Sequence, residues 1–176
     1  GWQLVLMRPS PPWAPGQNTQ ARNLLKGLAA VDPTESLLII EDDDWYAADW
    51  LTTVAAELQY AELVGEHRAR YYNVEQRRGR QLANTGHASL CSTAMRGSAL
   101  QDFADACRSR PKFIDLELWR RPRARRLFGG HRVVGIKGLP GRSGIGMGHD
   151  HEFRGEDDVS GALLRDWIGD DAEVYQ

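Results

Sequence analysis

The sequence lacks the features that mark the most easily recognised classes of small protein. It has only two cysteines, Cys91 and Cys107, which is too few for a disulfide framework or a four-ligand zinc site, so we expect a reducing, cytoplasmic environment. The longest clear apolar run, residues 37–40, is far shorter than the roughly 20 residues that cross a bilayer. The apolar stretch at residues 3–7 is too short for a signal peptide. These absences exclude a secreted disulfide-rich domain, a membrane span and a zinc finger.

The rest of the composition is ordinary for a globular protein. Of the 176 residues, 41% are hydrophobic and 26% are charged, which excludes a disordered chain and a collagen-like repeat. The length fits one domain, and the sequence has no repeat, internal linker or low-complexity segment. We therefore expect a single domain over residues 1–176.

Arginine carries almost all of the positive charge. Only three of the 22 basic residues are lysines, and the formal net charge is −2. Arginine forms planar, bidentate contacts with phosphate, whereas lysine acts as a point charge. The arginines gather in two stretches: Arg68, Arg70, Arg77, Arg78 and Arg80, then Arg120, Arg121, Arg123, Arg125, Arg126 and Arg132. This pattern indicates either a phosphate-bearing ligand or a genome that prefers arginine codons.

Hydrophobic periodicity predicts strands that alternate with helices early in the chain and antiparallel strands later. We expect strands at 3–7, 36–41, 61–66, 67–74, 87–96 and 131–138. We expect helices at 18–30, 47–60, 98–110, 113–121 and 157–168. This order predicts an α/β sandwich with a mixed sheet flanked by helices.

Four consecutive acidic residues, 41–44, follow the expected strand at 36–41. Ligands of open α/β sheets bind beyond the carboxyl ends of strands. Two unit charges 4 Å apart repel by about 4 kcal/mol at an effective dielectric near 20, so such a run either lies in water or faces a cation such as Mg²⁺ or Mn²⁺. On an extended segment Asp42 and Asp44 point to the same side, which predicts a metal-binding pair. The alternative is a helix N-terminus that favours acidic residues.

The stretches QARNLLKGL and LLIIEDDDWYAADWL resemble the GT-A glycosyltransferases, particularly the large family-two group. In that group an Arg-Asn pair opens a helix, and a hydrophobic strand then ends in an Asp-x-Asp motif. The matching residues here are Arg22 with Asn23, and Asp42 with Asp44 around Asp43. The resemblance implies a compact GT-A-like fold, with Mn²⁺ or Mg²⁺ held by Asp42 and Asp44. It also implies a nucleoside-diphosphate sugar donor. The metal bridges the donor's diphosphate, and Arg22, Asn23 and Asp43 contact the donor.

The segment FIDLELWRR, residues 113–121, carries a fainter part of the resemblance. Members of the group place an acidic pair at the head of a later helix, where it supplies the general base that deprotonates the acceptor hydroxyl. Asp115 is the matching candidate and Glu117 the second. Two residues apart on a helix, their side chains diverge, so we do not expect them to act as a pair. A helix N-cap is the simpler role for Asp115.

The loop GLPGRSGIGMGHD, residues 138–150, is rich in glycine, which lets backbone amides approach an anion. Its spacing matches neither a P-loop nor a dinucleotide fingerprint. In GT-A enzymes a loop near the C-terminus closes over the diphosphate and sometimes adds a histidine to the metal. The resemblance thus implies phosphate contacts for Lys137 and Arg142 and metal ligation by His149 or His151. A plain surface loop is the alternative.

Two more positions are donor-site candidates. Trp45 follows the acidic run, where an aromatic ring can stack on a base or sugar, although core packing is the alternative. Arg8 follows the expected strand at 3–7, where members of the group contact the nucleotide.

The resemblance covers residues 16–60, and residues 110–121 more weakly. Only 41 residues precede Asp42, so part of the usual N-terminal nucleotide-binding region, including the acidic residue that reads the nucleobase, has no counterpart. An otherwise complete miniature enzyme, a truncated one and a degenerate domain are all compatible with this departure.

We expect a metal-dependent, inverting glycosyltransferase with a hydroxyl acceptor. Small phage-encoded transferases of this kind suggest a hydroxymethylated base in DNA as one acceptor, reached in the host cytoplasm, with the arginines following the phosphates. The alternatives are a metal-dependent nuclease, since clustered aspartates also suit two-metal chemistry, and a non-catalytic binding module on a degenerate transferase fold.

Overall fold

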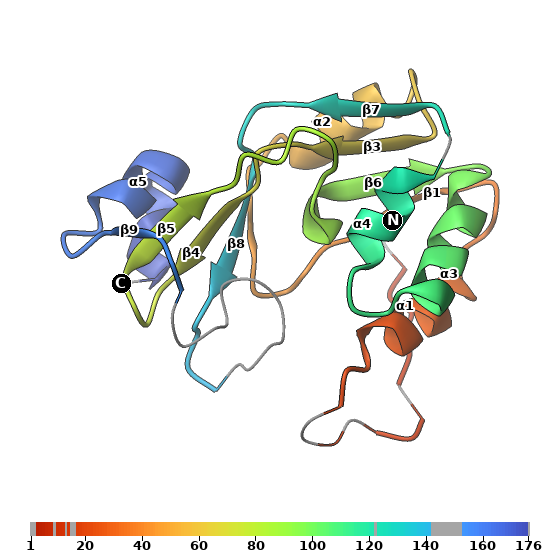
Figure 1. Cartoon of the computed structure of the whole chain (residues 1–176), viewed down its shortest axis with the longest axis horizontal. Helices are drawn as coiled ribbons and strands as arrows, with labels where there is room; N and C mark the ends of the chain where they lie inside the picture. The colour runs from red at the N-terminus through yellow and green to blue at the C-terminus, as the bar shows by residue number, and fades with distance from the viewer. Residues whose placement is uncertain are drawn as a thin grey trace.

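The computed structural model describes residues 3–8, 10–12, 14, 17–121, 123–141 and 153–175. Helices and strands are interspersed along the chain (Figure 1). The elements are α1 (Gln20–Leu28), β1 (Ser36–Leu38), β2 (Trp45–Tyr46), α2 (Trp50–Glu57), β3 (Leu63–Glu66), β4 (Arg70–Asn73), β5 (Arg78–Gln81), the 3-10 helix η1 (Leu90–Ser92), β6 (Thr93–Arg96), α3 (Ala99–Ser109), α4 (Ile114–Arg120), β7 (Arg125–Phe128), β8 (Val133–Lys137), β9 (Glu156–Asp157), α5 (Ala162–Ile168) and the 3-10 helix η2 (Gly169–Tyr175).

The strands form two mixed sheets. The first has the order β1-β6-β3-β7 and the second the order β2-β8-β4-β5-β9. Two pairs are parallel, β3 with β7 and β4 with β8, and the other pairs are antiparallel. The expected α/β class with mixed pairing and flanking helices is confirmed, with two sheets in place of one.

Two neighbouring connections are among those that join the two sheets. Residues 67–69 lead from β3 to β4, and residues 129–132 lead from β7 to β8, so one parallel pair continues into the other. The His67 amide donates to the Phe128 carbonyl over 3.0 Å and ties the connections together. We call these two connections the junction.

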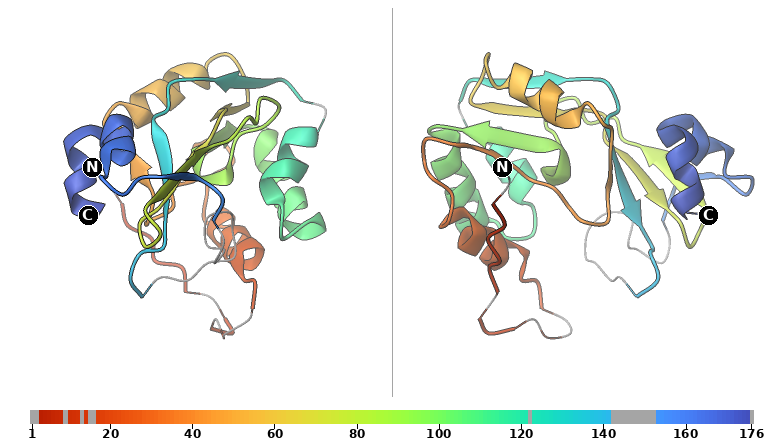
Figure 2. Two further views of the ribbon diagram at one scale, coloured as in Figure 1. Left: turned by 60° about the vertical axis from the view of Figure 1, so that its left-hand side comes forward. Right: turned by 180° about the vertical axis from the view of Figure 1, so that it is seen from behind.

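The first sheet is buried on both faces. Helices α1, α3 and α4 cover one face and α2 covers the other (Figures 1 and 2). Leu63 of β3 packs into the cluster with α3 and α4, and the next residue, Val64, packs against Trp50 and Val54 of α2. A strand with two buried faces is continuously apolar rather than alternating, which explains the run of apolar residues at the start of β3.

The second sheet packs against the C-terminal helices α5 and η2. Tyr72, Val134 and Ile136 contact Leu164 and Ile168 in one buried cluster. The turn with the acidic residues described below leads into β2 of this sheet. It lies against the end of the neighbouring strand β8.

Several expected elements differ in the structure. The strand predicted at residues 3–7 is wrong, because in the described part of the chain this segment pairs with no strand, and Leu4 and Leu6 are 92% and 72% exposed. Helix α5 begins at residue 162 rather than 157, and Val159 is 79% exposed instead of facing the core. None of the described helices is long and apolar enough to cross a membrane.

Replacing Gly65 with alanine is expected to lower the free energy of unfolding by about 1–3 kcal/mol. A Cβ at Gly65 would lie 2.5 Å from the Ala88 Cβ and 2.8 Å from the Ser92 carbonyl oxygen, in a fully buried strand. Gly27→Ala is the matched control, because nothing lies within 4 Å of its Cβ and alanine favours the helix by roughly 0.5–1 kcal/mol. Urea denaturation of both variants measures the difference, and equal effects would contradict the packing.

Candidate acidic site

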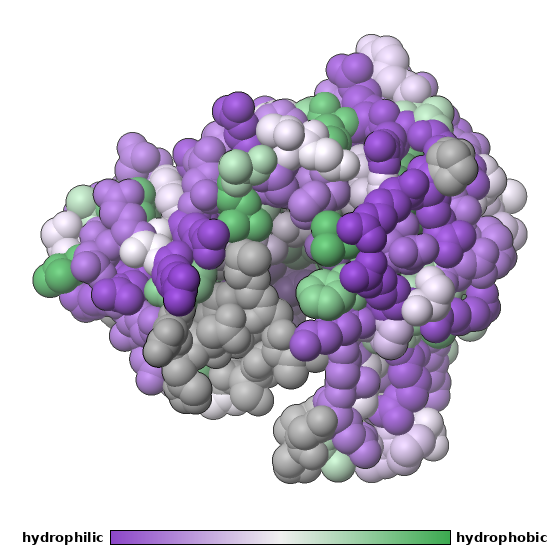
Figure 3. Space-filling view, viewed as in Figure 1, coloured by the Kyte–Doolittle hydropathy of each residue, from purple (hydrophilic) through white to green (hydrophobic). Residues whose placement is uncertain are grey.

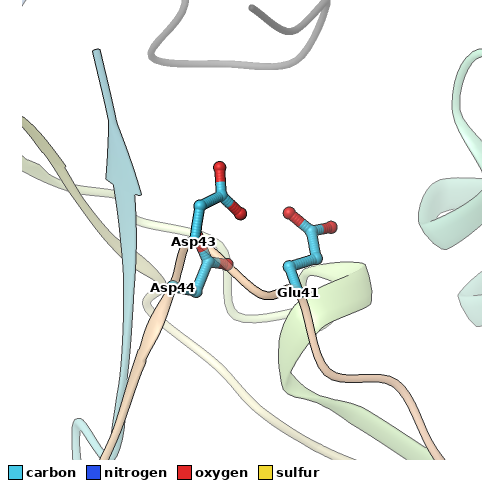
Figure 4. Close-up of side chains that lie close together, drawn as sticks. All are labelled: Glu41, Asp43 and Asp44. Carbon is cyan, nitrogen blue, oxygen red and sulfur yellow. The ribbon is translucent and has the colours of Figure 1, made fainter. Parts of the chain in front are cut away.

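The acidic run 41–44 forms a turn. The Asp44 amide donates to the Glu41 carbonyl over 3.3 Å, and residues 42 and 43 have turn geometry. The expectation of an extended segment is therefore wrong. The turn brings Glu41, Asp43 and Asp44 together, with one carboxylate oxygen of each within 4.8 Å of the others (Figure 4). The exposed side chain of Asp42 lies outside this set.

Asp44 is the buried member of the cluster. Its Oδ1 accepts hydrogen bonds from the Ile136 amide at 3.0 Å and from Lys137 Nζ at 2.8 Å, so the end of β8 fixes its position. Burial raises the pKa of this carboxyl to about 6, although the Lys137 charge opposes the rise. Its Oδ2 is buried and has no hydrogen-bond partner among the described residues, and the buried Cys91 thiol is its neighbour.

Lys137 extends its ammonium into the cluster from the end of β8. Nζ lies 2.8 Å from Asp44 Oδ1, 3.3 Å from Glu41 Oε2 and 3.6 Å from Asp43 Oδ2. Burial alone lowers the pKa of this ammonium, but the three carboxylates raise it above its usual value. Three carboxylates around one ammonium leave a formal excess of two negative charges.

The donor set fits a hard divalent cation. Mg²⁺ and Mn²⁺ prefer carboxylate oxygens, and the three oxygens are close enough to share one ion. Such an ion would balance the excess charge and would give the buried Asp44 Oδ2 a partner. The residues that would hold it are Glu41, Asp43 and Asp44.

The two candidate bases lie on α4 and have different partners. Asp115 is in the first turn, where its Oδ1 accepts from the Leu116 amide at 2.8 Å; the N-cap position belongs to Phe113. Glu117 Oε1 lies 3.5 Å from Arg121 Nη2 in an ion pair. The structure thus engages Glu117 with Arg121 and leaves the two carboxylates separate.

Tyr71 is influenced by the charges of both Asp115 and the acidic cluster. Its side chain is half-buried, and its hydroxyl donates to Ser89 Oγ over 2.8 Å. Burial is the main cause of the raised pKa of Tyr71, and the charges of Asp115 and Asp44 both raise it further. The Tyr71 hydroxyl therefore lies within electrostatic range of the Asp115 and Asp44 carboxylates.

The Arg-Asn pair on α1 divides into two roles. Nε and Nη2 of Arg22 are buried, and neither has a hydrogen-bond acceptor in the described part of the chain. Asn23 is exposed and donates from Nδ2 to Thr19 Oγ1 at 3.4 Å within its own helix. Arg22 is therefore the member of the pair with donors left for an anion.

The remaining candidates lie elsewhere. Trp45 packs into the second-sheet core and donates from Nε1 to Asp171 Oδ2 over 2.8 Å, in agreement with the core-packing alternative. Arg8 is exposed and follows no strand. Arg142, His149 and His151 lie outside the described residues.

Many of the clustered arginines form ion pairs within the chain. Arg123 pairs with Glu62 and Asp102, Arg126 with Glu57, Arg121 with Glu117 and Asp105, Arg132 with Asp49, and Arg78 with Asp157. The surface over α1, α3 and α4 is correspondingly hydrophilic (Figure 3). These pairs neutralise much of the positive charge of the second arginine stretch. Fewer of its arginines are therefore available to phosphate than the sequence alone indicated.

Two acidic residues were missed by the sequence analysis as site residues. Glu41 belongs to the cluster, and its place at the head of the acidic run was the available signal. Glu66 is 3% exposed, and its Oε1 and Oε2 accept from the Arg132 amide at 3.0 and 2.9 Å. The signal for Glu66 was a carboxylate that ends an otherwise apolar strand.

Glu66 makes the stability of the chain depend on pH. Burial raises its pKa from 4.5 to about 7. Because the folded pKa is above the unfolded one, the stabilisation is complete below about pH 4.5 and is lost as pH rises through 7, by roughly 3 kcal/mol. We expect Glu66→Gln to flatten the fall in unfolding free energy between pH 5 and 8, measured by urea denaturation. A slope equal to that of the unsubstituted chain would contradict the shift.

Comparison with known proteins adds no relative. No protein-family model, curated protein or solved structure matches the chain.

Proposed function

We propose that the chain is a metal-dependent glycosyltransferase of compact GT-A-like fold that moves a sugar from a nucleoside-diphosphate sugar to a hydroxyl acceptor. The observation that carries the proposal is the cluster of Glu41, Asp43 and Asp44 around Lys137, with its excess negative charge at the end of β8. The resemblance of the surrounding sequence to GT-A enzymes supplies the reaction class.

The donor diphosphate binds between the acidic cluster and α1 in this proposal. A divalent cation, when bound to the three carboxylates, neutralises charge on the departing nucleoside diphosphate. Arg22 supplies buried guanidinium donors that lack acceptors, and charge-assisted bonds from arginine to phosphate oxygens are among the strongest in proteins. Lys137 holds the carboxylates in place and limits their mutual repulsion.

Asp115 acts as the general base. Its Oδ1 is oriented by the Leu116 amide, and it takes the proton of the acceptor hydroxyl as that oxygen attacks the anomeric carbon. A bond forms from the acceptor oxygen to the carbon while the bond to the diphosphate oxygen breaks, and the electron pair leaves on the diphosphate. A single displacement of this kind inverts the anomeric centre.

A non-catalytic binding module is the second candidate, and one observation favours it. The Lys137 ammonium already contacts all three carboxylates, so the cluster has a cationic partner within the chain. In that case the cluster is a structural ion-pair network. The two functions differ in whether an added cation binds the carboxylates.

Release of nucleoside diphosphate from a panel of nucleotide sugars, with and without Mn²⁺, tests the proposal. Asparagine keeps the shape of the half-buried Asp43 side chain, whose Oδ2 lies 3.6 Å from Lys137 Nζ. We therefore expect Asp43→Asn to give a folded protein whose Mn²⁺-dependent turnover falls at least about 100-fold. Glu35→Gln, an exposed acidic residue outside the cluster, is the matched control and retains turnover. Nucleotide binding without turnover across the panel would favour the binding module instead.

A further inference from the structure

The junction between the sheets contains a pocket. Its lining includes Glu66, His67, Arg68, Arg70 and His131. These residues lie at the amino ends of β4 and β8, whereas the acidic cluster contacts Lys137 at the carboxyl end of β8. Four residue steps along a strand separate the two ends by about 13 Å. The pocket also reaches Cys91, a neighbour of Asp44, and Gly135, next to the Ile136 amide that Asp44 accepts from, so it adjoins the acidic cluster while its charged residues lie at the amino ends of the strands.

Basic residues outnumber acidic ones in the lining of this pocket. Two guanidinium and two imidazole groups line it, against the single carboxylate of Glu66, which already accepts from the Arg132 amide. Arg70 Nε donates to Gln81 Oε1 at 3.1 Å, and its guanidinium lies 5.0 Å from the Trp167 ring centroid, while the carboxylates of Asp166 and Glu66 act on it electrostatically. Nδ1 of His67 is buried without a hydrogen-bond partner among the described residues. The pocket thus presents two arginines and an unpartnered histidine nitrogen against the carboxylate of Glu66 and the nearby charge of Asp166.

Backbone strain accompanies the charge. Arg68 has φ 57° and His131 has φ 55°, in the left-handed region that non-glycine residues rarely adopt. The Asn84 carbonyl accepts from the Arg68 amide at 2.9 Å, and Asn84 Oδ1 accepts from the Ala69 amide at 3.0 Å. Both strained residues line the pocket, one from each connection of the junction. Strain of this kind concentrates where a ligand is bound.

We propose that the junction pocket binds a phosphate group, through Arg68, Arg70 and the two histidines. The ligand chemistry is shared by the phosphodiester of a nucleic acid and by the phosphomonoester of a small molecule. The proposal stands on the pocket and its charges, and does not depend on the transferase activity.

The binding is expected to strengthen as pH falls. Burial lowers the pKa of His131, and the neighbouring charges of Arg70, His67 and Arg68 lower it further. Burial raises the pKa of Glu66 to about 7. As pH falls through 7 Glu66 loses its negative charge, while the raised pKa values of the lining Tyr71 and Cys91 keep both neutral. The pocket therefore becomes more cationic.

Sulfate is the probe, because it stays a dianion between pH 6 and 8. We expect saturable shifts of histidine NMR signals, with affinity at least about tenfold greater at pH 6 than at pH 8. Arg68→Gly is expected to weaken binding at least about tenfold and also to raise the unfolding midpoint, because glycine accepts the left-handed conformation. Arg125→Ala, an exposed arginine of β7 outside the pocket, is the matched control and leaves both properties unchanged.

Competition identifies the source of the phosphate. Displacement of sulfate by a short single-stranded oligonucleotide assigns the pocket to a phosphodiester, and displacement by a sugar phosphate assigns it to a phosphomonoester. Absence of saturable shifts, equal binding in Arg68→Gly, or displacement by neither competitor overturns the proposal.

Discussion

Asp44→Ala is expected to lower the free energy of unfolding by about 3 kcal/mol at pH 7.5. The Asp44 side chain is fully buried and accepts from both the Ile136 amide and Lys137 Nζ. Its removal leaves a buried backbone donor unpaired and takes away the nearest counter-charge of a buried ammonium. Breaking one partner of a buried ion pair is strongly destabilising for this reason. Urea denaturation followed by circular dichroism measures the loss.

Two comparisons make this expectation specific. Asp44→Asn retains an acceptor for the Ile136 amide and should lose less stability than the alanine variant. Asp43→Ala removes a partner that lies 3.6 Å from Lys137 rather than 2.8 Å, and should cost less than about 1 kcal/mol. A loss at Asp43 equal to that at Asp44 would contradict the assignment of Asp44 as the buried anchor of the cluster.

Asp115→Asn is expected to reduce sugar transfer by about 10²–10⁴-fold while leaving Mn²⁺-dependent nucleotide binding unchanged. Asparagine keeps the acceptor for the Leu116 amide but cannot take the proton of the acceptor hydroxyl. The loss should therefore appear in kcat, because the donor contacts are made by other residues. Steady-state kinetics and nucleotide titration of the same preparation separate the two quantities.

Glu117→Gln distinguishes the two candidate bases. Its carboxylate is engaged with Arg121, so we expect turnover to change by less than about threefold, the scale of a surface ion pair. The reverse pattern, with turnover lost at Glu117 and kept at Asp115, would show that Glu117 is the base.

The fold was predictable where one physical rule decided the element. Apolar residues at helical spacing located α1 and α2, and the apolar run at residues 37–40 located β1. Strands β5 and β7 were missed because half of the residues in their sequences, RGRQ and RRLF, are charged. Their stability comes from pairing with β4 and β3, which single-sequence patterns do not contain. The segment at residues 3–7 shows the converse, since its apolar residues suit a strand but find no partner in the described chain.

The candidate site was predictable as chemistry and less so as geometry. The acidic run pointed to the correct segment, but an extended backbone selected Asp42 with Asp44, whereas the turn selects Glu41 and Asp43 with Asp44. The contact of Lys137 with all three carboxylates spans more than 90 residues of sequence, and only the pairing of β2 with β8 brings them together. Long-range contacts of this kind are set by sheet topology.

The most direct test of the central claim is a thermal-shift titration with nucleoside diphosphates in the presence and absence of Mn²⁺. A ligand at 100 times its dissociation constant stabilises the fold by about 2.7 kcal/mol, which is easily measured for a chain of this size. We predict a Mn²⁺-dependent rise in the unfolding midpoint with at least one nucleotide, lost in Asp43→Asn and retained in Glu35→Gln. An unsubstituted chain that shows no Mn²⁺-dependent shift with any nucleotide, or a shift that persists in Asp43→Asn, would contradict the cation site and with it the proposed transferase.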